Sequence, residues 1–75
     1  MENIIKQRVI SKLNANSIFS RETQILRIEQ IRKALLDLAT IDLLTDKEMF
    51  AIWDEIIAYM ERNDLTSLYV KKYCD

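Results

Sequence analysis

The residue types that catalyse covalent reactions are nearly absent from this sequence. Its 75 residues include one cysteine, Cys74, and no histidine. A Ser-His-Asp or Cys-His arrangement needs a positioned base beside the nucleophile, and a cysteine next to the C-terminal residue is poorly placed to hold an active geometry. We therefore expect Cys74 to be an incidental free thiol and the protein not to be an enzyme.

Pairs of carboxylates could serve in acid/base catalysis or could hold a magnesium ion together with a substrate phosphate. The candidates are Asp46 with Glu48, and Asp54 with Glu55. Neighbouring residues on a helix point about 100° apart, so Asp54 and Glu55 do not converge on one point. We expect a solvated acidic face, and we predict neither a metal site nor a cofactor.

Two groups of cations could contact nucleic acid. Lys6, Arg8 and Lys12 could form a phosphate-contacting surface, and the stretch 69–73 places two lysines between tyrosines, as in platforms that stack single-stranded bases. Two observations argue against a phosphate-contacting surface at Lys6, Arg8 and Lys12. The net charge is −1, and no helix is rich in base-reading side chains. For the second, a terminal helix with its tyrosines packed inward explains the pattern better.

Glycine and proline are both absent, whereas average usage is about 7% and 5%. Phosphate-binding glycine loops and tight hairpins are excluded with them. The chain is therefore predicted to be all-α, with Asn, Asp, Ser and Thr ending and starting its helices. We expect a single helical domain over residues 1–75. With one cysteine and no histidine, neither an internal disulfide nor a zinc site is expected.

The first half of the chain predicts two helices. One covers residues 2–13, after which Asn14 and Asn16 are expected to supply the left-handed residue that usually ends a helix. Ile18 and Phe19 are expected to plug into the core. Ser20 is the predicted N-cap of a second helix, whose isoleucines and leucines recur at the spacing of a helix bundle. Within it, Glu29 and Lys33 form an i, i+4 pair that we expect to mark the outer face.

The second half predicts a long helix and a short one. The stretch Thr45-Asp46-Lys47-Glu48 is a capping box, so the third helix is predicted to begin there and to run to about Arg62. Asp64 could then cap a short fourth helix. Residues 67–73 also alternate passably as an edge strand, but no partner strand is predicted elsewhere, so we favour a helix for residues 65–73. The basic start of the chain and the acidic third helix are expected to attract each other.

The third helix carries more apolar side chains than one neighbour can cover. At helical pitch they span about half the circumference, wider than the ~100° stripe of an ordinary surface helix. They are Met49, Phe50, Ile52, Trp53, Ile56, Ile57, Tyr59 and Met60. Two interpretations stay open: all eight are core, or part of the arc forms a homodimer seam or a partner site. The second interpretation selects the aromatic and methionine-rich subset typical of interface centres, namely Met49, Phe50, Trp53, Ile57 and Met60.

The sequence thus predicts a small three-helix bundle with a short C-terminal fourth helix, possibly dimerised. The leading functional hypothesis is a non-enzymatic module that binds another protein, as a homodimeric regulator or inhibitor. A small DNA-binding regulator that uses the basic first helix is the alternative. No apolar run approaches the ~20 residues that cross a bilayer, and the charged start differs from a signal peptide, so a cytoplasmic protein is expected. The composition resembles that of bacterial and phage accessory factors.

Overall fold

A computed structural model describes residues 2–74 of the chain, with side chains from residue 4 onward. Every regular element in that range is helical, which confirms the all-α prediction and decides residues 65–73 in favour of helix. The elements are α1 (Glu2–Ala15), a 3₁₀ turn η1 (Asn16–Ile18), α2 (Arg21–Thr40), α3 (Asp46–Arg62), α4 (Thr66–Tyr69) and a π-helical turn η2 (Val70–Cys74). Within residues 2–74, no helix combines the length and apolarity needed to cross a membrane.

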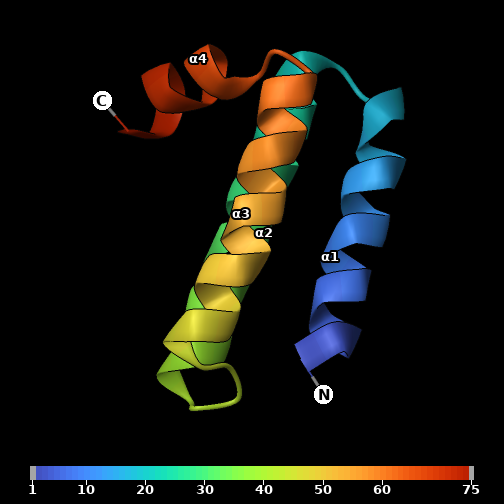
Figure 1. Cartoon of the computed structure of the whole chain (residues 1–75). Coiled ribbons are helices and arrows are strands. Elements are labelled where there is room, and N and C mark those ends of the chain that lie inside the picture. Colours follow the sequence, from blue (N-terminus) through green and yellow to red (C-terminus); the bar gives the residue numbers. More distant parts are fainter. Residues whose placement is uncertain (1, 75) are drawn as a thin grey trace.

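The long helices form a bundle in which α3 contacts all the other helices. Both α1 and α2 pack on α3, and α4 contacts α2 and α3. In Figure 1, α2 lies behind α3 and α1 runs along one side of this pair. The short α4 turns away at the end of α3 and projects on the side opposite α1 (Figure 1). Two opposite sides of α3 are therefore covered by different elements.

The core is built mainly from isoleucine, leucine and tyrosine contributed by every α-helix. Its buried apolar side chains are Val9, Leu13, Ile25, Ile28, Leu35, Leu44, Ile52, Ile56, Tyr59, Met60, Leu65 and Tyr69. Burying each large aliphatic side chain contributes about 1.5–3 kcal/mol before chain entropy is subtracted. Half of the apolar arc of α3, residues Ile52, Ile56, Tyr59 and Met60, belongs to this set.

Side-chain caps start the two long helices as the sequence predicts. The Ser20 side chain accepts a hydrogen bond from the backbone N–H of Thr23. At the start of α3, the Thr45 hydroxyl accepts from the Glu48 N–H, and the Glu48 carboxylate accepts in return from the Thr45 N–H. Each cap satisfies backbone donors that have no partner inside the helix. The predicted boundaries at Ser20 and Thr45 are confirmed.

Aspartate, rather than asparagine, supplies the left-handed residues that end the helices. Asp42 has φ of 62° and Asp64 has φ of 56°, and no other residue described has a positive φ. After α2, Leu43 N–H donates to the Leu38 carbonyl and Asp42 N–H to the Ala39 carbonyl, the bond pattern of a Schellman motif. The prediction for Asn14 and Asn16 is therefore wrong. Asp64 lies at the end of α3 but does not cap α4, so its predicted role as the cap of the fourth helix is wrong too.

The connection between α1 and α2 is a polar junction. Asn16 is fully buried; its amide donates to the Gln24 carbonyl, and its side-chain oxygen accepts from Arg27 Nε at 2.7 Å. Arg27 also lies over the ring of Phe19, 4.6 Å from its centre. Ile18, by contrast, is 83% exposed. The expectation that it plugs into the core is wrong, because the 3₁₀ turn points Asn16 inward instead.

The left-handed aspartate at the end of α2 should limit the stability of the fold. We expect Asp42→Gly to raise the free energy of unfolding by about 0.5–1 kcal/mol, since glycine adopts positive φ without a Cβ penalty. Asp42→Val should lower it by about 1–2 kcal/mol. Urea unfolding followed by circular dichroism measures both changes.

The matched control for this substitution is Asp37→Gly, the same change inside α2. It should lower the free energy of unfolding by a few tenths of a kcal/mol, on the order expected from helix propensity. If Asp42→Gly destabilises as Asp37→Gly does, the left-handed conformation at Asp42 carries no strain.

Candidate functional site

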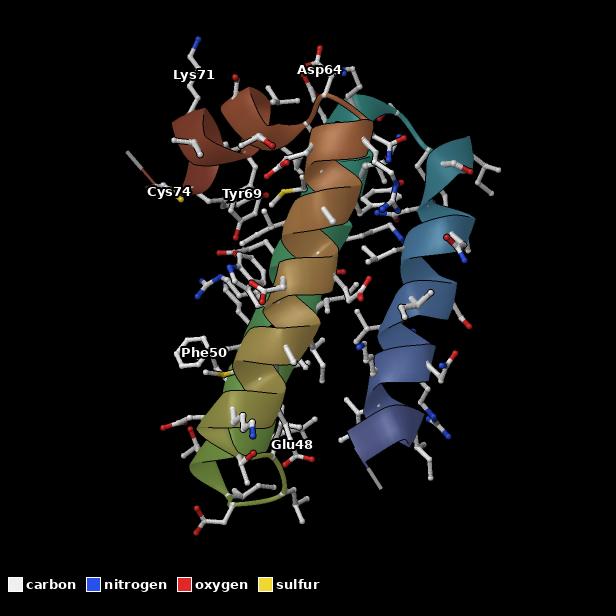
Figure 2. All side chains as sticks on the ribbon, in the orientation of Figure 1. Glu48, Phe50, Asp64, Tyr69, Lys71 and Cys74 are labelled. Carbon is white, nitrogen blue, oxygen red and sulfur yellow. The ribbon has the colours of Figure 1, made fainter. Side chains whose placement is uncertain are left out.

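The side of α3 opposite α1 is only partly covered. Phe50 is 61% exposed, the most exposed aromatic side chain described. Figure 2 shows it pointing away from α1, on the same side of α3 as α4 but near the opposite, N-terminal end of α3. Its position is fixed by the capping box, because Phe50 lies in the first turns that Thr45 and Glu48 organise. A rigid helix therefore holds this ring in solvent.

Phe50 borders a shallow groove between α2 and α3. The groove has a volume of about 200 Å³ and is lined by Arg32, Leu35, Leu36, Met49, Phe50 and Trp53. We call these six residues the Phe50 face. Leu36 is 40% exposed, and Met49 and Trp53 are half-buried. Arg32 is the only charged side chain among the six, so the face is apolar with one cation at its border.

A buried carboxylate holds α4 beside this face. Glu29 on α2 is 8% exposed. Its Oε1 accepts from the Tyr69 hydroxyl at 2.8 Å and from Arg32 Nε at 2.6 Å, and its Oε2 accepts from Arg32 Nη2 at 2.9 Å. The expected outer-face role of the Glu29–Lys33 pair is therefore wrong, because Glu29 turns inward to α4 and pairs with Arg32.

The ionised state of Glu29 is favoured by its partners. The hydrogen bonds from Arg32 lower its pKa from the ordinary 4.5, against the opposing effect of burial. Burial, together with the hydrogen bond to Glu29, raises the pKa of Tyr69 above its ordinary value. Tyr69 therefore stays a neutral donor, and Glu29 stays a charged acceptor, across neutral pH. This is the arrangement in which a charge-assisted hydrogen bond is strongest.

Aromatic contacts extend the same junction along α4 and η2. The rings of Trp53 and Tyr69 are 6.2 Å apart between centres, and those of Tyr69 and Tyr73 are 5.2 Å apart, both tilted. Figure 2 shows Tyr69 pointing from α4 toward the long helices. The tyrosines thus pack inward, as the sequence predicts, while Lys71 and Lys72 are exposed. A base-stacking platform is not formed.

The five predicted interface residues separate into two groups. Met49, Phe50 and Trp53 come together on the Phe50 face. Ile57 is half-buried against the core, and Met60 is 3% exposed, so Met60 serves the core of this chain rather than an open surface. Arg32 and Leu36 were not predicted as neighbours of Phe50. The signal was present, because Glu29, Arg32 and Leu36 follow one another at helical spacing beside the apolar stripe of α2.

The predicted basic trio also separates. Lys6 pairs with Glu55 of α3 at 3.7 Å, which confirms the expected attraction between the basic start and the acidic helix. Arg8 and Lys12 are exposed and lie along a different groove, between α1 and α2. The three cations therefore do not form one phosphate-binding row.

Between residues 2 and 74 there is no group of three or more acidic, cysteine or histidine side chains that could hold a metal ion. Cys74 is an exposed free thiol. Comparison of the chain with protein families, curated proteins and solved structures finds no match. Surface geometry is thus the basis for a functional proposal.

The Glu29 junction predicts a specific dependence of stability on pH. Because the pKa of Glu29 is lower in the folded chain, its contribution is present above pH 4.5 and is lost as pH falls through the folded pKa. Glu29→Gln should lower the free energy of unfolding at neutral pH by about 1–3 kcal/mol. It should also flatten the acid limb, measured by urea unfolding at several pH values.

Glu61→Gln, an exposed position on α3, is the control for removing one carboxylate. It should leave the acid limb close to that of the unmodified protein. Parallel acid limbs for the unmodified chain and Glu29→Gln would contradict the described role of Glu29.

Proposed function

We propose that this protein is a non-enzymatic interaction module that forms a homodimer through the Phe50 face and acts as a regulator or inhibitor by binding another protein. The observation that carries the proposal is the 61% exposure of Phe50 beside an apolar groove on the same face. Aromatic and methionine side chains are enriched at the centres of protein interfaces. Leaving them in water is unfavourable by roughly 25 cal/mol per Å² of apolar surface.

The Phe50 face has the features that a two-fold interface requires. Such an interface is self-complementary, so a projecting group must lie near a depression that accepts the same group from the second copy. Phe50 projects, and the groove of about 200 Å³ between Leu36, Met49 and Trp53 is its immediate neighbour. Arg32 at the border can lie over the incoming ring, as Arg27 lies over Phe19 within the chain.

The alternative of a DNA-binding regulator has weaker support. Lys6 is already engaged by Glu55, which leaves Arg8 and Lys12 of the predicted trio, and both border an apolar groove. Phosphate contacts require several cations on one accessible surface. An apolar groove offers nothing to a phosphate backbone.

The homodimer predicts that a charge at Phe50 separates the copies without unfolding them. Because Phe50 is mostly solvent-exposed in one chain, Phe50→Asp should leave the helical content unchanged. It should weaken self-association on the order of thirtyfold or more, the effect of an interface hot spot. Sedimentation equilibrium over micromolar concentrations measures the association, and circular dichroism measures the fold.

Ile18→Asp is a matched control, because Ile18 is 83% exposed at η1 and does not line the Phe50 face. It should leave self-association unchanged. A strictly monomeric unmodified protein at ~100 μM, or equal dissociation by both variants, would refute the homodimer.

A further inference from the structure

A second groove, on a different side of the bundle, has a distinct chemical character. It runs between α1 and α2 and has a volume of about 330 Å³. Its apolar lining includes Ile5, Val9, Ile31, Leu35 and Leu38. It remains open because α1 packs mainly on α3 rather than on α2. We call it the α1–α2 groove.

Cations border this groove. Arg8 and Lys12 of α1 line it directly. Arg27 of α2 lines a neighbouring depression of about 250 Å³ that shares Lys12, Ile31 and Ala34 with the groove. Among the side chains that the structure describes, no Asp or Glu lines either depression. The border is therefore uniformly positive around an apolar floor.

Lys6 lies on a different side of α1 from the two cations that line the groove. Lys6 is paired with Glu55 across the α1–α3 contact. Arg8 and Lys12 are exposed on another side of α1, where α1 presents its cations to the groove. Arg27 is held by Asn16 and Phe19, so Arg8 and Lys12 are the border cations that can meet a partner of opposite charge.

We propose that the α1–α2 groove binds an acidic amphipathic helix of a partner protein. The apolar stripe of that helix covers the floor, and carboxylates along its edge meet Arg8 and Lys12. These two cations are one helical turn apart, about 6 Å along α1, which matches acidic residues at i, i+4 spacing on a partner helix. A helix laid in a groove is an established mode of peptide recognition.

This proposal is independent of the homodimer. Phe50 lines the groove on the α2–α3 side and does not line the α1–α2 groove. The binding measurement is therefore made on both the unmodified chain and Phe50→Asp, and the affinities should agree. Failure of the homodimer leaves the test of this groove intact.

The probes are three synthetic peptides of about 14 residues, the shortest length with appreciable helicity in water. The first carries leucines at helical spacing with glutamates beside them. The second replaces every glutamate with lysine, and the third has the composition of the first in an order that gives no apolar stripe. Fluorescence anisotropy of each labelled peptide, titrated with the full chain, measures binding.

The first peptide should bind at least about tenfold more tightly than the other two, a difference of about 1.4 kcal/mol. A double variant, Arg8→Glu with Lys12→Glu, should reverse the preference toward the lysine peptide. Ala34→Glu should abolish binding of the first peptide, because Ala34 is exposed and lines the groove. Glutamate is a good helix former, so the fold is retained.

Ala51→Glu is the matched control, since Ala51 is exposed on α3 and lines neither groove. It should leave binding unchanged. Equal binding of the first and third peptides would reduce the effect to general charge attraction and overturn the proposal. Loss of self-association in Ala34→Glu would assign the groove to a second copy of this chain and overturn it as well.

Discussion

The arrangement of this protein depends on covering the wide apolar arc of α3. A helix with an ordinary stripe needs one partner, but α3 is contacted by α1, α2 and α4. The two long helices cover most of it. On the remaining side, the described residues 2–74 supply the four residues of α4 and the turn η2. Because α4 and η2 are short, they cover α3 only as far as Trp53, which contacts the ring of Tyr69. Phe50, one turn closer to the start of α3, is left exposed.

Buried polar contacts determine which arrangement of helices is adopted. Tyr59 of α3 donates to the side chain of Gln24 on α2 at 2.8 Å, and Tyr69 of α4 donates to Glu29. Each bond joins two residues that are at least 35 positions apart in the sequence. No buried side-chain nitrogen or oxygen between residues 4 and 74 lacks a partner. Since an unpaired buried polar group costs about 1–3 kcal/mol, alternative packings that break these pairs are disfavoured.

The fold was predictable because its signals are local. The capping box at Thr45, the N-cap at Ser20 and the absence of glycine and proline act over a few residues, and each led to a correct element. The errors concern long-range contacts. Glu29 was predicted to lie on the surface because Lys33, four residues later, could pair with it on an exposed helix face. Its actual partner is the hydroxyl of Tyr69, which is 40 positions away in the sequence. Asn16 was predicted to end a helix from its local sequence alone. Its burial depends instead on hydrogen bonds with Gln24 and Arg27, which lie farther along the chain.

The candidate surface was predictable in part. The excess of apolar residues on α3 correctly indicated that one neighbour could not cover the helix, and it selected Met49, Phe50 and Trp53. It could not separate Met60 from Phe50, because exposure depends on where α4 lies. The position of α4 is set by the hydrogen bond between Tyr69 and Glu29, and no residue pattern within α3 predicts it. The split of Lys6 from Arg8 and Lys12 likewise depends on which neighbour each side of α1 meets.

The proposed interface on the side of α3 that α4 leaves open can be tested with residues of the chain itself. Two methionines on α3 are built-in probes of it, since Met49 lines the Phe50 face and Met60 is buried in the core. Methyl NMR of methionine-labelled protein, recorded on dilution from millimolar to micromolar concentration, compares them directly. If this side is an interface, we expect the Met49 signal to shift on dilution while the Met60 signal stays fixed. Two unmoved signals, or a shift confined to Met60, would contradict it.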